Sequence, residues 1–408
     1  MAAEIEIGEK QKFNVILSTF FPKSWVARFG SKDNYNIAHH YDPSKNASST
    51  CINMNFQIKY ATCFIAGTYY KDMINFFNNI NYLKFGVASQ IDFDVEGADD
   101  VLGLAKNYTN NEESIIWTMY ENGQISSKSF SIKYFSDDNI QMYLGDEHED
   151  FKDKSNTGSC QLLNKTSFDN LLWTCKLYSF GLISNDNSTK YNISCGYDVL
   201  FDTGSNVMIL PTETLEKIKD ELVKYNCYFI KYNNFYLILC EDINNLPHIF
   251  IELGNYILFL NNQELYTYIL DETKNKYNYA LKCYFMDNLQ ISIIGHPFFK
   301  LFHTKFDYEN KVLKFYSNRI GGIKLNKSEE NNDENKNENK NENKTENKNE
   351  GEFPTLYTVL ISVGGFIIII IIIIVIFILV KNKNKKEEIK SLIEDDNNDK
   401  NDDNMLPF

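Results

Sequence analysis

The sequence predicts a mainly β folded region followed by one transmembrane helix, and three features of the chain carry this prediction. Between residues 4 and 320, short runs of Ile, Val, Phe and Tyr alternate with turns rich in Asn, Asp, Gly and Ser. Near the C-terminus, residues 356–380 form an uncharged, Ile-rich stretch. Within the β-rich region, an apolar run leads directly into Asp202-Thr203-Gly204-Ser205, which places a carboxylate in a tight loop where Gly204 permits close backbone approach.

Several strands and one helix are clear from the residue pattern. Strands are expected at residues 13–17, 55–59, 129–134, 199–201 and 248–253. A helix is expected over residues 212–224, because it follows Pro211 and carries an apolar stripe of Leu215, Ile218 and Leu222 at helical spacing.

The stretch at 356–380 is long enough to cross a bilayer, since about 20 apolar residues suffice. A buried core helix would be shorter and amphipathic. Lys381, Lys383, Lys385 and Lys386 follow at once, so the positive-inside rule places the C-terminus in the cytosol. We therefore expect a type I single-pass protein with a transmembrane helix at 355–380.

Two low-complexity segments flank the expected span. Residues 323–354, dominated by Asn, Glu and Lys, predict a disordered stalk, because they cannot bury enough apolar surface to offset the entropy of ordering. Residues 381–408 form a polar cytosolic tail. Within it, Glu388, Leu392 and Ile393 fit an acidic dileucine pattern that cytosolic sorting adaptors bind, although a chance match in a short tail explains it equally well.

Composition narrows the classes of partner and site. The 408 residues include 43% hydrophobic side chains, and the net charge is −14. No segment combines dense Lys and Arg with aromatic residues, so nucleic acid is not an expected partner. The eight cysteines form no CxxC pair or Cys/His cluster with zinc spacing, and the six histidines show no ligand spacing, so no metal site is expected.

The predicted compartment is the secretory or endolysosomal pathway or the cell surface, with the folded region lumenal or extracellular. All eight cysteines precede the apolar stretch, which favours disulfides. All seven Asn-x-Ser/Thr sequons precede it too, which is typical of a glycoprotein. No signal peptide is visible at Met1–Glu4, so we expect that the native start is missing, or else that the Ile-rich segment acts as a late signal anchor. The sequons start at Asn46, Asn107, Asn164, Asn187, Asn192, Asn326 and Asn343.

Around Asp202 the sequence resembles the second lobe of the pepsin family of aspartic proteases (peptidase A1). The segment at 201–222 is similar to that family's catalytic loop and the helix after it, and the segments at 293–299 and 306–308 are similar to its closing landmarks. The first lobe is recognisable as well, at residues 5–16, 85–88 and 101–105, with Tyr60 at the position of the flap tyrosine. Trp25 is grouped with Tyr60 as a flap residue, and it fixes the register of the first catalytic loop.

The resemblance implies a bilobal pepsin-like acid protease fold, with one lobe at 1–150 and the other at 151–322. It implies a cleft that binds extended peptides or protein substrates, and no cofactor. It also implies a disulfide between Cys240 and Cys283, while Cys51–Cys63 and Cys175–Cys195 are pairings suggested only by position.

The first catalytic loop departs from the family pattern. The family has Asp-Thr-Gly-Ser there, whereas this chain has Ser18 at the aspartate position, Thr19 retained and Phe20 at the glycine position. No Asp or Glu lies between residues 13 and 30, so a shift of register cannot restore the carboxylate. The family mechanism needs two carboxylates that share one proton, and Ser18 cannot exchange a proton at neutral or acid pH.

Three readings of function follow. The leading one is a membrane-anchored pepsin-family homologue, or pseudoprotease, with a peptide-binding cleft and impaired proteolysis. The second is an active aspartic endopeptidase, a hydrolase that relies on Asp202 alone or with a partner such as Asp33. The third is a non-enzymatic surface glycoprotein that uses the fold as a binding scaffold.

Overall fold

The computed structural model describes much of residues 1–325. The described part excludes 22, 34–36, 61–62, 93–99, 106–113, 137–138, 164–172, 185–189, 233–234, 243–245, 272–275, 290 and 318–321. The expected transmembrane segment, the cytosolic tail and all of the stalk after residue 325 lie outside it. Among the described residues, no helix has both the length and the apolar composition needed to cross a membrane.

Strands of the first 103 residues form one sheet within the described part of the chain. Its order is β1-β2-β7-β3-β6-β5-β4, and β1 also pairs with β5. Apolar residues alternate along the central strands, so that one face of β2 buries Phe13, Val15 and Leu17. The strands are β1 (Ala2–Ile7), β2 (Gln11–Ser18), β3 (Trp25–Asp33), β4 (Thr50–Tyr60), β5 (Cys63–Phe76), β6 (Asn79–Asp92) and β7 (Asp100–Gly103).

A second sheet joins the two halves of the chain, because its strands come from both sides of residue 150. Among the described residues its order is β10-β23-β22-β8-β9. Phe130 on β8 stacks on Phe306 on β22, with ring centroids 4.6 Å apart. The strands are β8 (Ser129–Ser136), β9 (Asn139–Leu144), β10 (Thr157–Gln161), β22 (His303–Asp307) and β23 (Val312–Tyr316).

The third sheet contains the rest of the described strands. Its order is β18-β19-β15-β20-β13-β21-β12-β11-β16-β17-β24, with β14 paired to β15. These strands are β11 (Thr174–Ile183), β12 (Lys190–Phe201), β13 (Met208–Pro211), β14 (Cys227–Tyr232), β15 (Phe235–Cys240), β16 (His248–Leu253), β17 (Tyr256–Leu260), β18 (Tyr266–Asp271), β19 (Lys276–Leu281), β20 (Cys283–Met286), β21 (Ser292–Ile294) and β24 (Ile323–Leu325).

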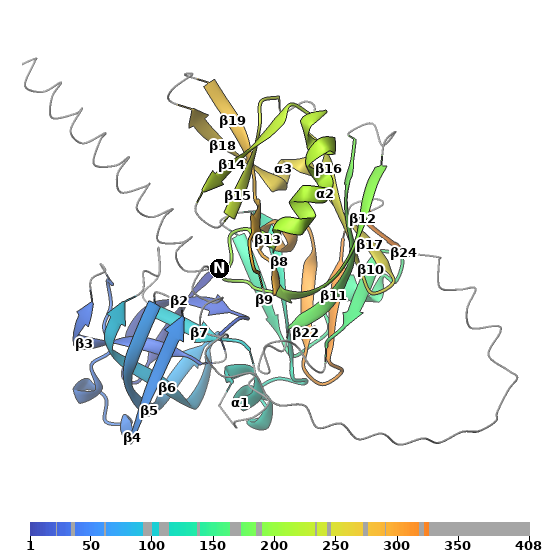
Figure 1. Ribbon diagram of the computed structural model, residues 1–408. Coiled ribbons are helices and arrows are strands. Elements are labelled where there is room, and N and C mark those ends of the chain that lie inside the picture. The colour runs from blue at the N-terminus through green and yellow to red at the C-terminus, as the bar shows by residue number, and fades with distance from the viewer. Residues whose placement is uncertain are drawn as a thin grey trace, which may run out of the picture.

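Helices are few and short in the described part. Figure 1 shows two strand-rich bodies, with β2–β7 in one and most of the later strands in the other, and with the N-terminus near their junction. The helices are α1 (Ile115–Glu121), α2 (Thr212–Val223), α3 (Asn262–Leu265) and α4 (His296–Phe299), with 3₁₀ turns η1 (Pro43–Lys45) and η2 (Glu149–Lys152).

The strands and the helix expected from the sequence are confirmed. Each expected strand falls inside β2, β4, β8, β12 or β16, and the expected helix is α2. Leu215, Ile218 and Leu222 are buried along one face of α2, as their spacing predicts. The fold is mainly β, as the sequence predicts.

One boundary was wrong. The composition predicts that residues 323–325 belong to the disordered stalk, but they form β24 and pair with β17, with Ile323 opposite Leu258. Ile323 is 7% exposed. The low-complexity composition that predicts the stalk begins only after this strand, so burial of one isoleucine extends the folded region past residue 322.

Candidate active site

The two loops expected to form the site follow corresponding strands. Ser18 is the last residue of β2, and β2 runs parallel to β7, with Ser18 opposite Gly103. Asp202 follows the end of β12, which runs parallel to β21, with Phe201 opposite Ile294. Each loop therefore begins beside a neighbouring apolar strand that either ends in a glycine or is followed by one. The two loops contact each other.

Thr19 and Thr203 join the loops through buried hydrogen bonds. The Thr203 backbone N–H donates to Thr19 Oγ1 at 2.9 Å, and the Thr19 backbone N–H donates to Thr203 Oγ1 at 3.2 Å. Thr19 Oγ1 in turn donates to the Phe201 carbonyl at 2.7 Å, and Thr203 Oγ1 donates to the Leu17 carbonyl at 2.6 Å. This reciprocal arrangement holds Ser18 and Asp202 in adjacent positions.

Ser18 is 1% exposed, and its hydroxyl oxygen accepts two backbone hydrogen bonds. The donors are the N–H groups of Phe20 and Phe21, both 3.2 Å from Ser18 Oγ. With its oxygen engaged as acceptor, the hydroxyl offers its proton to a neighbouring group. That neighbour is Asp202: burial raises the pKa of its carboxyl, and the hydrogen bond from Ser18 is among the weaker effects that oppose this rise.

Asp202 is 6% exposed, and burial raises the pKa of its carboxyl to about 6. Three weaker effects oppose burial by favouring the charged form: the backbone N–H of Gly204, the positive charge of the Met1 amino group and the Ser18 hydroxyl. Gly204 N donates to Asp202 Oδ1 at 2.8 Å. The carboxyl is therefore protonated in mildly acid solution and charged at neutral pH.

Gly204 lies against both polar side chains of the site. A Cβ at this position would lie 3.2 Å from Asp202 Oδ1 and 3.6 Å from Ser18 Oγ. The absence of a side chain therefore keeps the space beside the two groups open. Ser205 supports the loop rather than the carboxylate, because its hydroxyl donates to the Val207 carbonyl at 2.9 Å.

The other expected site residues are placed as follows. Trp25 is fully buried at the start of β3, where it packs in a cluster with Phe56, Tyr69 and Val101. Tyr60 ends β4 opposite Cys63, at the hairpin where a flap is expected, but its side chain lies outside the described part. The side chain of Asp33 lies outside it too, so the alternative partner for Asp202 stays a prediction.

Phe20 occupies the position where the family has glycine. Its ring is half-buried, packs against the main core and lies edge-on to the Phe21 ring, with centroids 5.1 Å apart. The loop still supplies backbone N–H groups to residue 18, as Gly204 does to Asp202. The phenylalanine is thus accommodated without loss of the contact between the loops.

His296 was not among the residues expected at the site. Its Nε2 lies 3.1 Å from the Thr203 carbonyl oxygen, and its backbone N–H donates to the Ser205 carbonyl at 2.8 Å. The feature of the sequence that could have indicated His296 is its position directly after Gly295, in a segment similar to a family landmark. It was missed because a single histidine without ligand spacing indicates no particular role.

The disulfide implied by the resemblance was wrong. Cys240 bonds to Cys227, and Cys283 is a buried free thiol. Cys227 and Cys240 lie directly opposite each other on the antiparallel strands β14 and β15, with Cα atoms 4.0 Å apart, whereas Cys283 lies opposite Met208. A disulfide needs Cα atoms within about 7 Å of each other and Cβ atoms that face each other, so strand register decides the partner.

The two pairings suggested by position were wrong as well. Cys175 bonds to Cys160, with Cα atoms 6.2 Å apart, which leaves Cys195 as a free thiol. Cys51 is also free and lies opposite Tyr70 rather than Cys63.

Comparison with known proteins identifies the family of this chain. A model of the eukaryotic aspartyl protease family matches residues 1–317. Pregnancy-associated glycoprotein 2 of Bos taurus is 21% identical over 309 residues, which cover 74% of this chain and 77% of that protein. The family match extends over both catalytic loops, the one with Ser18 included. The chain belongs to the eukaryotic aspartyl protease family.

Proposed function

We propose that this protein binds extended peptides or protein segments in a pepsin-like cleft and cleaves them poorly or not at all. The observation that carries the proposal is the placement of Ser18, which occupies the partner position of Asp202 and is held there by the Phe20 and Phe21 N–H groups. Membership of the family supports a peptide or protein as the ligand.

The chemistry of the Ser18–Asp202 pair explains the expected impairment. In a pair of carboxylates, one group deprotonates a water while the other protonates the scissile carbonyl. A serine hydroxyl can hold a water by hydrogen bonding but does not take up or release a proton between pH 3 and pH 7. Loss of a positioned general acid or base costs about 10²–10⁴-fold in rate, and loss within a coupled pair costs more.

A specific observation favours residual activity as the second candidate. Burial raises the pKa of Asp202 to about 6, so this group can still donate a proton in mildly acid solution. The loops are also joined by intact threonine contacts. The alternative hypothesis is therefore an active endopeptidase that relies on Asp202, and the experiment must distinguish it from impaired proteolysis.

The decisive experiment assays the full-length chain for cleavage of casein and haemoglobin between about pH 3 and pH 6, the range that a shared-proton mechanism favours. We expect cleavage at the level of an Asp202→Ala control. Efficient cleavage that Asp202→Ala abolishes would refute impairment. Binding of a statine-type transition-state mimic by the wild type supports a peptide-binding cleft, whereas no binding favours a scaffold without a peptide site.

We also propose that residues 355–380 anchor the protein as a type I membrane protein of the secretory or endolysosomal pathway or the cell surface. The uncharged Ile-rich stretch and the lysines after it support this orientation. Resistance to alkaline extraction tests the anchor, and digestion of the tail, but not of the folded region, by protease added to sealed vesicles tests the orientation. Replacement of Leu392 and Ile393 by alanine tests the sorting-adaptor motif, since a working motif requires both side chains.

A further inference from the structure

A cluster of metal-ligand side chains lies away from the catalytic loops, where η2 meets the sheet that joins the two halves. Asp150 Oδ2 lies 2.8 Å from His303 Nδ1 and 3.3 Å from His148 Nδ1. All three ligand atoms fall within 4.8 Å of one another. His148 precedes η2, Asp150 lies within it, and His303 begins β22.

We propose that His148, Asp150 and His303 form a binding site for a divalent transition metal, with Zn²⁺ the best-fitting ion. Two imidazoles and one carboxylate, with a fourth position left to water, are a common ligand set for Zn²⁺. Ligands about 2.0–2.2 Å from a tetrahedral ion lie roughly 3.3–3.5 Å from each other. The Asp150–His303 separation of 2.8 Å must therefore open slightly, while the ligand atoms of His148 and His303, which lie within 4.8 Å of each other, must come to this spacing.

The surroundings of His303 match those of a metal-bound histidine. Its other nitrogen, Nε2, lies 2.9 Å from Ser131 Oγ. When Nδ1 binds the metal, the ring proton resides on Nε2 and donates to Ser131, which fixes the tautomer and the plane of the ring. The rings of Phe151 and Tyr143 pack against His303 with centroids 4.6 and 5.7 Å away, so part of the site is shielded from water.

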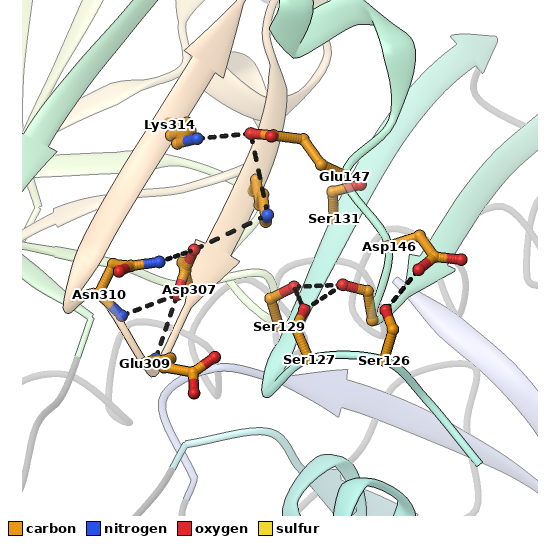
Figure 2. A network of polar contacts seen from close by, with 12 residues as sticks. Ser126, Ser127, Ser129, Ser131, Asp146, Glu147, Asp307, Glu309, Asn310 and Lys314 are labelled. Atoms are coloured by element: carbon orange, nitrogen blue, oxygen red, sulfur yellow. Dashed lines mark hydrogen bonds and ion pairs between the residues drawn. The ribbon is translucent and has the colours of Figure 1, made fainter. Parts of the chain in front are cut away.

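The segment that carries His148 and Asp150 is held from outside the cluster. Glu147 forms ion pairs with Lys314 on β23 and, at 3.9 Å, with Lys305 on β22. Asp146 accepts a hydrogen bond from Ser126 (Figure 2). These contacts anchor the residues just before His148 to two strands, and a pre-positioned ligand set loses less entropy when the ion binds.

In this structure, Lys133 supplies the positive charge beside Asp150. Its Nζ lies 2.7 Å from Asp150 Oδ2, which is the oxygen that the metal would need. Lys133 and His303 both line a surface pocket, together with Phe135, Glu264, Lys300 and Tyr316. Because the Phe135 ring lies 5.1 Å from Lys133 Nζ, the lysine can leave Asp150 and still rest on an aromatic face beside the entrance.

Binding also has a cost at His148. Its Nδ1 accepts the backbone N–H of Asp150 at 3.2 Å, and this weak contact is lost when the lone pair turns to the metal. The displaced Lys133 and this lost contact both lower the affinity. The site is therefore expected to bind more weakly than a cysteine-rich structural site and to tighten when Lys133 is removed.

The cluster also has the order of a serine-hydrolase triad, Ser131–His303–Asp150. Ser131, however, is 1% exposed and lies in the middle of β8, so no substrate carbonyl can reach its hydroxyl. Lys133 and His303 line the pocket and Ser131 does not, which favours a small cation over an acyl substrate.

The test titrates the full-length chain with Co²⁺, whose visible absorption reports tetrahedral coordination, and then displaces it with Zn²⁺. The wild type is expected to bind one equivalent at the cluster. His148→Ala, a change at a partly exposed ligand, is expected to weaken binding by at least about 10-fold. Lys133→Met is expected to strengthen it. His248→Asn, remote from the cluster on β16, serves as the matched control and is expected to bind like the wild type.

Two results would overturn the proposal. One is the absence of saturable binding up to about 1 mM metal, which corresponds to less than about 4 kcal/mol of binding free energy. The other is binding that His148→Ala and His248→Asn leave equally unchanged, which would place the ion elsewhere. Thermal unfolding provides a second readout, because an ion bound to the folded state raises the midpoint of the wild type and not of His148→Ala.

Discussion

Thr19 and Thr203, 184 positions apart in the chain, each donate a backbone N–H to the other's side-chain oxygen. Both hydroxyls also donate to a backbone carbonyl on the opposite loop. Four hydrogen bonds thus join two segments that are too far apart in the sequence for local structure to bring them together. Because all of these groups are buried, the loss of one partner leaves the other polar group with neither a protein partner nor water to hydrogen-bond to.

The first prediction concerns this contact. Thr203→Val keeps the shape of the side chain but leaves the Thr19 N–H and the Leu17 carbonyl without their partner. We expect the free energy of unfolding to fall by about 2–6 kcal/mol, since each of the two unsatisfied buried groups costs about 1–3 kcal/mol. Urea denaturation measures the change. Thr50→Val, which alters an exposed hydroxyl on β4, is the control and should change stability by less than about 0.5 kcal/mol.

The second prediction concerns pH. Burial raises the pKa of Asp202 to about 6 in the folded state, while the unfolded value stays near 3.8. Between these values the folded protein binds more protons than the unfolded one, so stability decreases as pH rises from about 4 to about 6. The loss amounts to about 3 kcal/mol, because one pKa unit corresponds to 1.36 kcal/mol.

Asp202→Asn removes this titration. The variant should match the wild type below about pH 4 and exceed it in stability above about pH 6. Ser18→Ala removes a hydrogen bond that favours the charged carboxylate, so the transition should move to higher pH. Denaturation at a series of pH values measures both effects. A wild-type profile that coincides with that of Asp202→Asn throughout would contradict the raised pKa.

The third prediction concerns repair of the catalytic pair. Ser18→Asp combined with Phe20→Gly restores a second carboxylate and the open loop of the family. If impairment comes from residue 18, peptide cleavage at acid pH should rise by at least about 10²-fold over the wild type. The same double variant carrying Asp202→Ala is the control and should remain inactive. A folded double variant without activity would place the defect elsewhere in the site.

The fourth prediction concerns the cysteines. Cys240→Ala breaks the bond to Cys227 and should lower the free energy of unfolding by about 2–4 kcal/mol. Cys283→Ala removes only a small buried thiol and should cost about 1 kcal/mol. Non-reducing peptide mapping should recover the 227–240 and 160–175 linkages. Recovery of a 240–283 linkage would contradict the strand register.

The fifth prediction concerns glycosylation. Asn192 is exposed on β12, whereas Asn46 is 5% exposed and donates to Asp72 Oδ2 at 3.0 Å while accepting the Glu9 N–H at 2.8 Å. A glycan requires a free, accessible amide nitrogen. Mass spectrometry of protein expressed in a secretory host should find Asn192 modified and Asn46 unmodified. Occupancy at Asn46 would show that the glycan is attached before this contact forms.

The sequence by itself determined the fold class, because strand formation depends directly on local patterns of alternating apolar residues and turn residues. It also determined the Asp202 motif, the helix α2 and the serine at position 18, since each depends on residue types at short spacing. Apart from the stalk boundary, where a single buried isoleucine extends the fold, these local predictions agree with the described residues.

Only the tertiary structure decided which distant groups meet. Cys240 pairs with Cys227 through strand register, Ser18 serves Asp202 as a hydrogen-bond donor, and His296 joins the site from a segment that local pattern did not distinguish. His148, Asp150 and His303 likewise have no ligand spacing in the sequence, yet β22 brings the third beside the other two. Long-range contacts of this kind follow from the packing of whole sheets, which short-range spacing does not encode.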